Sequence, residues 1–327
     1  MSKIPKIIVF NDYIASVCAF WRSQYPLSLL ARQGLINLVV GEYGKEDWTK
    51  LSSCDIAFFQ RPMSKNVKDQ VFMAKDMGLK IIVDLDDYNF ISPHHPVYNV
   101  WCEQYDDKVF EKIMMITDVV TTTTKELQKH YLSYNNNVVI IPNAVDGDWL
   151  KFKPCSNKKS IILRAGSHHL SDVWLFRNEI VEVLNKHKDW HFIVIGGEIE
   201  FLKRKVNYLL YQDMDIHQYF ATILGLNASI FIVPLEDNEL NRCKSNISFQ
   251  EAAISGAVAL TPYWWNLHNC SVTYRDKKSF ADGLEKLITD YDLRQDLHAK
   301  AIKKINANYL LSDANKQRMK IINELTE

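Results

Sequence analysis

Three carboxylates follow a run of apolar residues in Lys80–Phe90, KIIVDLDDYNF. In an extended strand Asp84 and Asp86 project to the same face. Two carboxylates that close stay ionised together only when a cation or hydrogen-bond donors lie between them. The spacing therefore indicates a divalent-metal site. Two other interpretations stay open: Asp86 or Asp87 acts as an acid or base, or Asp84 bonds backbone N–H groups at the end of a buried strand.

A second set of polar residues lies in Ile230–Pro262, after another buried strand. Lys244 and Ser245 are expected to open a helix that Gly256 ends. A lysine at a helix N-terminus adds a cation to a site that already favours anions, which suits a diphosphate. Glu251, six residues after Ser245, could accept hydrogen bonds from both hydroxyls of a ribose. The alternative is a solvated lysine and a glutamate that suits the helix dipole.

The elements that must position these residues are short β-branched runs separated by helix-length stretches. Runs that are apolar on both faces and alternate with helices indicate buried parallel strands in βα units. The predicted strands are 6–10, 35–40, 55–60, 79–85, 117–123, 137–142, 160–166, 190–197, 229–235, 257–262 and 271–275. The predicted helices are 67–77, 106–115, 125–134, 171–187, 245–255, 279–290 and 293–309.

The strand series restarts after residue 157, and about eleven strands would strain one sheet. The pattern predicts two doubly wound, Rossmann-like domains, 1–150 and 151–327. The closing amphipathic helix, 314–325, could cross back to the first domain. Because ligands bind beyond the carboxyl ends of strands, two facing domains would hold a donor on one side of a cleft and an acceptor on the other.

The segment 234–256 resembles the nucleotide-sugar-binding core of GT-B glycosyltransferases, in particular the large retaining family 4. Many of these enzymes read P-L-x-D-N-x-F-N-x-x-K-S-x-x-K-x-x-E, with a glycine five residues later. The chain departs at Leu240, where Phe is usual, and at Ser248, where Lys is usual. Cys243 takes the place of the first Glu of an E-x(7)-E pair. The matching residues are Pro234, Leu235, Asp237, Asn238, Asn241, Lys244, Ser245, Glu251 and Gly256.

Four other segments resemble the same family in the same order: VVTTTTKEL (119–127), VVIIPNAVD (138–146), ILRAGSHHLSD (162–172) and WHFIVIGG (190–197). The resemblance implies a donor site in the second domain. There Gly166, Ser167 and His169 would line the phosphate and sugar. Asn241, Lys244, Ser245 and Glu251 would bind the nucleotide. Asp172 is expected to cap the helix that starts at Val173.

The acceptor side is placed in the first domain. Arg22 lies in a stretch that resembles the family's x-R-x-x-x-P-x-x-x-L and could bind an anionic group. His94, His95 and Tyr98 lie in ISPHHPVYNVW (91–101), which is either an acceptor-binding loop or a rigid turn with packed aromatics.

The resemblance implies a hexosyl- or pentosyltransferase that moves a sugar from a nucleotide diphosphate sugar to a hydroxyl, with retention and without a metal. Asp86 and Asp87 would face the acceptor, and Lys244 would stabilise the departing diphosphate. Three alternatives are kept: a DNA acceptor carrying a hydroxymethylated base, a GT-A transferase whose metal is held by Asp84 and Asp86, and a GT-B-fold epimerase. A glycan or lipid-linked saccharide is the commonest acceptor of similar enzymes.

Composition narrows the setting. Lys+Arg and Asp+Glu are both 39, so no net charge draws the chain to nucleic acid or an anionic membrane. Six scattered cysteines form no C-x-x-C pair, which argues against zinc and a disulfide framework. No run approaches a membrane span. We expect the protein to lie in the cytoplasm, or in the host cytoplasm if a phage encodes the chain.

The basic segment FLKRKVNYLLYQ (201–212) is predicted to be a solvated helix face, with membrane or nucleic-acid contact as the alternative.

Overall fold

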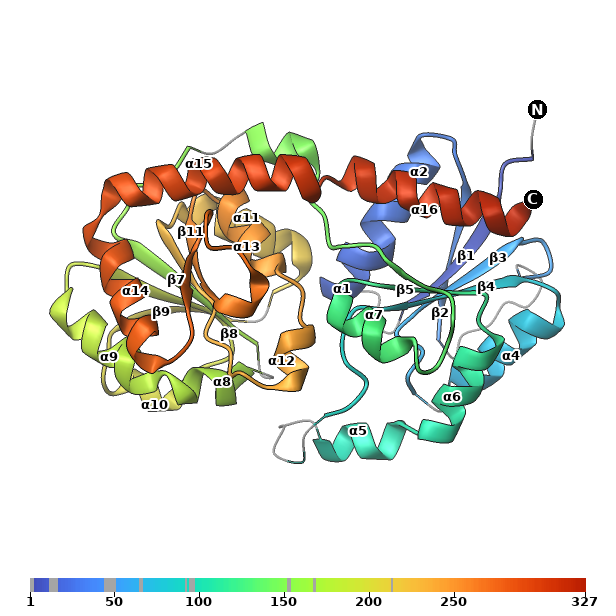
Figure 1. The fold of residues 1–327 in the computed structure, drawn as a ribbon, viewed down its shortest axis with the longest axis horizontal. Helices are drawn as coiled ribbons and strands as arrows, with labels where there is room; N and C mark the ends of the chain where they lie inside the picture. Colours follow the sequence, from blue (N-terminus) through green and yellow to red (C-terminus); the bar gives the residue numbers. More distant parts are fainter. Residues whose placement is uncertain are drawn as a thin grey trace. The chain divides into compact units, whose positions relative to one another are not determined.

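The computed structural model describes residues 3–11, 17–43, 51–64, 67–91, 93, 98–151, 154–166, 169–212 and 214–327. The chain forms two compact units. Unit 1 contains 1–144, 243–245 and 311–327, and unit 2 contains 145–242 and 246–310. Each unit is built on a parallel six-stranded sheet flanked by helices (Figure 1). The predicted fold class, two Rossmann-like α/β domains, is confirmed.

The sheet of unit 1 has the order β2-β1-β3-β4-β5-β6. Its strands are β1 (Lys6–Asn11), β2 (Asn37–Glu42), β3 (Ile56–Gln60), β4 (Lys80–Leu85), β5 (Val119–Thr122) and β6 (Val138–Ile140). Its helices are α1 (Val17–Ala19), a π-helix (Phe20–Gln24), α2 (Tyr25–Arg32), α4 (Lys68–Asp76), α5 (Tyr98–Gln104), α6 (Asp107–Ile116), α7 (Lys125–Tyr131) and α16 (Leu311–Thr326).

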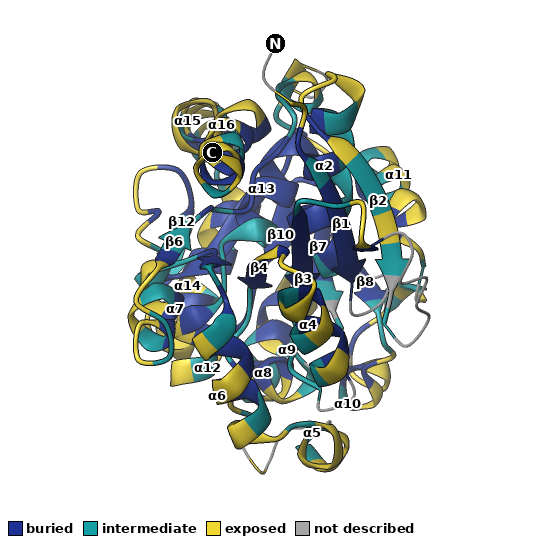
Figure 2. Ribbon diagram, turned by 90° about the vertical axis from the view of Figure 1, so that its right-hand side faces the viewer, coloured by how far each residue is buried: buried dark blue, intermediate teal, exposed yellow. Residues whose placement is uncertain are grey.

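The two faces of this sheet bury different residues, as the two-residue period of a strand requires. Ile8 and Phe10 of β1 pack in a core with residues of α4, α6 and α7. Ile7 and Val9 pack on the other face with residues of α2 and α16. The middle strands β1, β3 and β4 are buried, as Figure 2 shows. This explains why these strands are apolar on both faces in the sequence.

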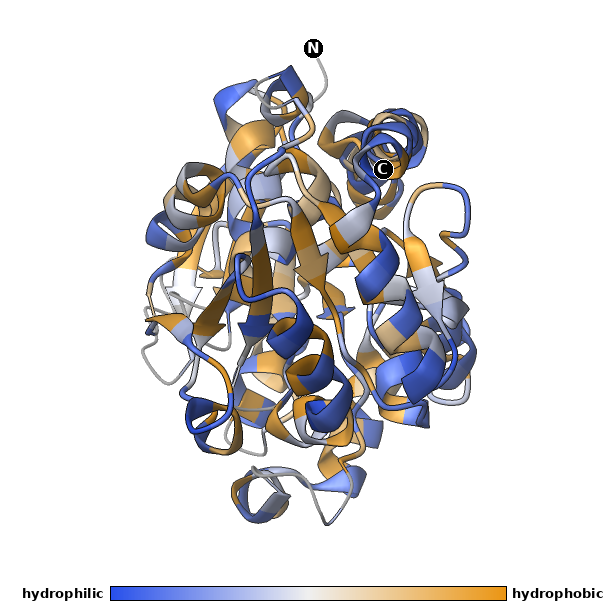
Figure 3. Cartoon of the chain, turned by 90° about the vertical axis from the view of Figure 1, so that its left-hand side faces the viewer, coloured by the Kyte–Doolittle hydropathy of each residue, from blue (hydrophilic) through white to orange (hydrophobic). Residues whose placement is uncertain are grey.

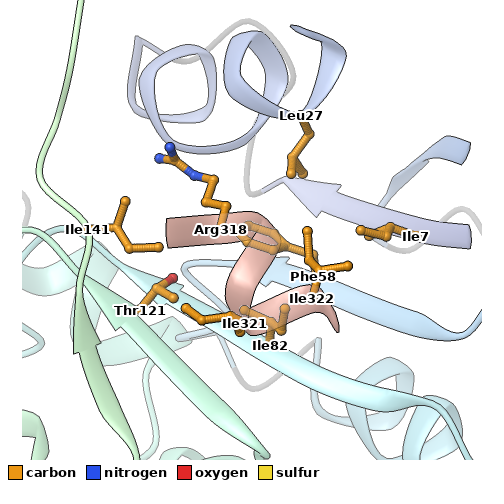
Figure 4. Close-up of a pocket in the computed structure, with 9 residues that line it drawn as sticks. All are labelled: Ile7, Leu27, Phe58, Ile82, Thr121, Ile141, Arg318, Ile321 and Ile322. Atoms are coloured by element: carbon orange, nitrogen blue, oxygen red, sulfur yellow. The ribbon is translucent and has the colours of Figure 1, made fainter. Parts of the chain in front are cut away.

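Helix α16 closes the second core of unit 1. A small cavity of about 10 Å³ lies under it (Figure 4). Arg318 of α16 lines this cavity and is 5% exposed, and its guanidinium is turned away from the isoleucines of the lining. Arg318 Nη1 donates to Asn315 Oδ1 at 3.1 Å, and Asn315 Nδ2 donates to the Pro26 carbonyl at 3.0 Å. The bond from Asn315 to Pro26 ties α16 to α2.

The sheet of unit 2 has the order β12-β11-β10-β7-β8-β9. Its strands are β7 (Ser160–Ala165), β8 (His191–Gly196), β9 (Tyr208–Tyr211), β10 (Ile230–Ile232), β11 (Val258–Pro262) and β12 (Val272–Tyr274). The helices from residue 145 to 310 are a 3-10 helix (Gly147–Lys151), α8 (Leu170–Leu175), α9 (Arg177–Lys186), α10 (Glu200–Lys203), α11 (Ile216–Leu226), α12 (Glu239–Cys243), α13 (Ile247–Ile254), a 3-10 turn (Tyr263–Trp265), α14 (Lys277–Thr289) and α15 (Tyr291–Asn308). In Figure 3 the strands are mostly hydrophobic and the surrounding helices carry hydrophilic stretches.

The division of the chain and several of its elements differ from the sequence prediction. The units part after Ala144 instead of residue 150, and 243–245 group with unit 1. The predicted helix 171–187 is two helices, α8 and α9. The segment 201–212 is not one helix face, because α10 ends at Lys203 and edge strand β9 begins at Tyr208. Among the described residues no helix is long and apolar enough to cross a membrane.

Two helical glycines of unit 2 give opposite expectations for the same substitution. A Cβ on Gly283 of α14 would lie 2.9 Å from Val272 Cγ1 and 3.0 Å from Leu260 Cδ1, whereas one on Gly225 of α11 would meet nothing within 4 Å. Gly283→Ala should lower the free energy of unfolding by roughly 1–3 kcal/mol through overpacking. Gly225→Ala should leave it unchanged or raise it by up to about 1 kcal/mol through helix propensity. Urea denaturation followed by circular dichroism measures both, and equal effects would contradict the packing of α14 on β11 and β12.

Candidate active site

The side chain of Asp84, the first carboxylate of the acidic run, is buried in unit 1. Arg22 Nε donates to Asp84 Oδ1 at 3.0 Å and Nη2 donates to Oδ2 at 2.7 Å. Thr121 Oγ1 donates to Oδ2 at 2.7 Å. The remaining Arg22 nitrogen, Nη1, donates to the Ile141 carbonyl at 2.7 Å and to Asn143 Oδ1 at 3.1 Å. Burial opposes the charge of Arg22, but the Asp84 carboxylate prevails and raises the pKa of the guanidinium.

This pairing bears on two predictions. Arg22 has an exposed fraction of 0% and is a structural residue of unit 1, and its predicted contact with the acceptor stays a prediction. Asp84 lies in β4 and pairs with Arg22, whereas Asp86 follows that strand and pairs with Arg61. Both oxygens of Asp84 accept hydrogen bonds, so its role is structural, but the donors are the side chains of Arg22 and Thr121 and not the backbone N–H groups that the structural alternative expected. The alternative of a GT-A fold is wrong, because the chain has two parallel six-stranded sheets.

Asp86 and Asp87 lie beside a cationic residue that the sequence analysis missed. Arg61 follows β3 and pairs with Asp86, and its Nη2 lies 3.5 Å from Asp87 Oδ2. The backbone of Arg61 has φ 52°, a conformation that is uncommon outside glycine and that concentrates at functional sites. Burial opposes the charge of Arg61, but Asp86 and other neighbours raise its pKa well above the usual value. The Tyr131 hydroxyl donates to the Asp87 carbonyl at 2.6 Å.

Lys244 joins the same cluster in unit 1. Its Nζ lies 4.0 Å from Asp87 Oδ1, although the two residues are far apart in sequence. Both neighbours of Lys244 are anchored. The Cys243 carbonyl accepts a hydrogen bond from Thr124 Oγ1 at 3.1 Å, and Ser245 Oγ accepts one from Asn143 Nδ2 at 2.8 Å. Lys244 and Ser245 lie between α12 and α13 and do not open the helix as predicted, because α13 begins at Ile247.

In unit 2 the predicted ribose ligand Glu251 is buried in α13. Its carboxylate accepts from Arg164 Nη1 at 3.1 and 3.3 Å and from the Tyr219 hydroxyl at 2.9 Å. Arg164 lies near the end of β7, and its guanidinium is 5.2 Å from the centre of the Tyr219 ring. Burial raises the pKa of Glu251, and the Arg164 charge partly offsets that rise. The pair therefore holds a carboxylate at the carboxyl end of β7.

The turn after β7 carries Gly166 and His169. The Gly166 carbonyl accepts from the His169 N–H at 2.9 Å, and His169 Nδ1 lies 2.9 Å from Asp172 Oδ2. Asp172 Oδ1 accepts from the Glu236 N–H at 3.0 Å and from Asn241 Nδ2 at 2.8 Å. The capping role predicted for Asp172 is wrong, because α8 begins at Leu170 and this carboxylate joins the turn to the loop after β10.

Asn241 is 2% exposed, and its amide also donates to the Glu236 carbonyl at 3.0 Å. Its side chain thus shapes this loop, and the nucleotide-binding role predicted for it stays a prediction. Gly256, with φ 84°, follows α13 as expected. Tyr98 is the partly exposed first residue of α5. Ser167, His94 and His95 lie outside the described residues.

Arg61, Arg164 and Tyr219 are the polar partners that sequence reasoning missed. Arg61 stands directly after an apolar strand, and Arg164 stands inside one. A charged residue in or just after a buried strand needs a partner of opposite charge, and that was the available signal. Tyr219 gave no such signal, because a helical tyrosine ordinarily packs.

The two-unit architecture is that of the GT-B glycosyltransferases. An alpha-glucosyltransferase in complex with UDP has a TM-score of 0.68 and 11% identity, covering 97% of this chain and 99% of that one. An alpha-glucosyltransferase in complex with UDP and a 13-mer DNA containing a central A:G mismatch has a TM-score of 0.69 and 10% identity, with coverage of 97% and 99%. Sucrose-phosphate synthase from Thermosynechococcus elongatus has a TM-score of 0.64 and 11% identity, with coverage of 98% and 99%.

At these identities the likeness defines the fold. No protein-family profile and no curated protein matches the chain.

The Arg22–Asp84 pair should be a large contributor to the stability of unit 1. Asp84→Asn leaves the buried Arg22 charge without its counter-ion and should lower the free energy of unfolding by about 3–5 kcal/mol. Asp148→Asn removes the exposed pair with Lys151 and should change it by less than about 1 kcal/mol. Urea denaturation compares the two variants, and equal small effects would contradict a structural Asp84.

The Arg164–Glu251 pair gives a pH-dependent expectation. An acid whose pKa is raised by folding stabilises the folded state less as the pH rises from its unfolded pKa through its folded pKa. Arg164→Met removes the charge that limits the raised pKa of Glu251. The stability difference between the variant and the wild type should therefore be larger at pH 8 than at pH 4.

Urea denaturation at the two pH values measures that difference. Arg177→Met is the control, since Arg177 contacts the Trp174 ring and carbonyl and its loss should act equally at both. If Arg164→Met lowers the free energy of unfolding by the same amount at pH 4 and at pH 8, the pairing of Arg164 with Glu251 is contradicted.

Proposed function

We propose that this chain is a glycosyltransferase that moves a hexose or pentose from a nucleotide diphosphate sugar to an acceptor hydroxyl. The observation that carries the proposal is the approach of Lys244 to Asp87, with Nζ and Oδ1 4.0 Å apart at the carboxyl edge of the unit 1 sheet. A cation suits the charge of a departing diphosphate, and carboxylates beside it suit the orientation of an acceptor hydroxyl. UDP is the first nucleotide to test, because fold neighbours are described in complex with it.

The roles of the unit 1 residues follow from their charges. Lys244 stabilises the negative charge that develops on the departing diphosphate. The hydrogen bonds of its neighbours Cys243 and Ser245 fix the position of the Lys244 backbone. Asp86 and Asp87 orient the acceptor hydroxyl. Arg61 is a positioning residue, because its guanidinium pairs with both carboxylates.

In unit 2, Glu251 receives the ribose hydroxyls while Arg164 and Tyr219 hold its carboxylate. Gly166, Ser167 and His169 line the phosphate and sugar, and Ser245 contributes a hydroxyl beside Lys244. Support comes from the buried carboxylate at the end of β7 and from the Asp172 bonds that order the turn after that strand. Tyr98, His94 and His95 belong to the proposed acceptor side.

The reaction breaks the bond between the sugar C1 and the phosphate oxygen and forms a bond between C1 and the acceptor oxygen. We propose retention of configuration, as in the family 4 enzymes that the motif resembles. The hydroxyl proton then passes to the departing phosphate oxygen, so no dedicated base is needed. The diphosphate charge is balanced by Lys244 and helix ends without a metal ion.

A DNA acceptor bearing a hydroxymethylated base is the second candidate, favoured by the fold neighbour that is described in complex with DNA. Its competitor is a glycan or lipid-linked saccharide. Salt-sensitive binding to duplex DNA distinguishes them, since phosphate contacts weaken steeply with ionic strength.

The decisive experiment measures release of nucleoside diphosphate from a panel of UDP-, GDP- and ADP-sugars, with mass spectrometry of the acceptors. Lys244→Ala should lower turnover by roughly 10²–10³-fold, the size expected when one stabiliser of transition-state charge is removed. Lys112→Ala, on an exposed helix face of the same unit, should leave turnover unchanged. Wild-type turnover in Lys244→Ala would refute the assignment. Activity that EDTA abolishes and manganese restores would refute the metal-free mechanism.

A further inference from the structure

A pocket of about 600 Å³ lies in unit 2, at the amino ends of β8 and β9 and beside the end of α9. We call it the β8–β9 pocket. It is lined by Leu184, Asn185, Lys188, Trp190, His191, Phe192, Lys203, Arg204, Lys205, Val206, Asn207, Tyr208 and Leu209. Its volume is in the range of sites that take a small molecule.

The rim of this pocket is basic. Lys188, His191, Lys203, Arg204 and Lys205 are all exposed, and the lining contains no Asp or Glu. Lys203 pairs with Glu198 at 2.5 Å. Among the residues that the structure describes, Lys188, Arg204 and Lys205 form no salt bridge. Three cations thus lie around one concavity whose lining has no carboxylate.

Apolar residues also line the pocket. Leu184, Trp190, Phe192 and Val206 are each at most 9% exposed, and Tyr208 is partly buried. Trp190 is supported from its own unit, because the Arg294 guanidinium lies 5.4 Å from the centre of the ring. Basic and apolar side chains around one concavity suit a ligand that has an anionic group and an apolar body.

The pocket is separate from the proposed donor residues. It lies where β8 begins at His191, whereas the turn of Gly166 follows the carboxyl end of β7, which pairs in register with β8. Five residue steps along β8, at roughly 3.3 Å each, put about 17 Å between the two ends of the sheet. The pocket is therefore not the nucleotide-sugar site under another description.

We propose that the β8–β9 pocket binds a small phosphate ester with an apolar or aromatic body. Arg204 and Lys205 bind the phosphate, with Lys188 beside them, and the body lies on the Trp190 side of the pocket. Arginine and lysine are the usual phosphate ligands of proteins, and the absence of acids from the lining leaves their charge available to an anion. This inference stands whether or not the proposed glycosyl transfer is correct.

Isothermal titration calorimetry with 1-naphthyl phosphate tests the proposal, with inorganic phosphate and 1-naphthol as partial probes. The double variant Arg204→Gln/Lys205→Gln should weaken naphthyl phosphate binding by at least about tenfold, because two charge-assisted contacts are lost. Lys277→Gln/Lys278→Gln removes the same charge from an exposed helix start elsewhere in unit 2 and should leave binding unchanged. Both partial probes should bind more weakly than naphthyl phosphate.

Equal binding by the wild type and Arg204→Gln/Lys205→Gln would overturn the proposal, and so would failure of naphthyl phosphate to bind the wild type. Cosedimentation with anionic phospholipid vesicles, lost in that variant while the soluble probe never binds, would overturn it in favour of a membrane contact. Equal thermal midpoints of the variants and the wild type establish that folding is not the cause of any loss.

Discussion

The buried ion pair of Arg22 and Asp84 is the constraint on which unit 1 depends. One carboxylate receives Arg22 and Thr121, and the rest of the guanidinium reaches Ile141 and Asn143. The pair therefore fastens the segment after β1 to β4, β5 and the exit of β6. A buried pair tolerates its desolvation only when the remaining hydrogen-bonding groups are also satisfied, and this one has them. Asn143 then reaches Ser245, so the same network extends to the residue beside Lys244.

Unit 1 buries a second guanidinium, that of Arg318, near the same carboxylate. Burial, with added repulsion from Arg22, lowers the pKa of Arg318, and Asp84 only partly offsets this. One carboxylate thus serves two nearby arginines. The unfavourable free energy of burying the Arg318 charge is offset by the packing of α16, whose Ile321 and Ile322 belong to the core beside it. This explains why a helix with so polar a sequence holds a fixed place in the fold.

Most of the fold could be predicted because its buried strands are recognisable in the sequence. Strands buried on both faces read as apolar runs, and all the predicted runs became strands. Strand β9 was missed for the converse reason: it is a four-residue edge strand with Leu209 55% exposed, so its sequence resembles a solvated helix. The site was less predictable, since motif spacing identifies residue types but not their partners. The acidic run could not show that Asp84 pairs with Arg22, because Arg22 comes from a distant segment of the sequence. Asp172 has the position of a helix cap in the sequence, but its carboxylate accepts hydrogen bonds from the loop after β10.

The path of the chain between the units has a practical consequence. The backbone passes from one unit to the other at 144/145, 242/243, 245/246 and 310/311. A fragment ending at Ala144 would lack α16, leaving Ile7, Val9 and Leu27 without the cover they have in the second core. It would also lack the tripeptide that carries Lys244. Neither unit is therefore a contiguous piece of sequence. Cutting the chain between the units would expose apolar surface on one fragment, because the segments that cover that surface would remain on the other fragment. A chain built this way is best studied whole, with point substitutions in place of excised domains.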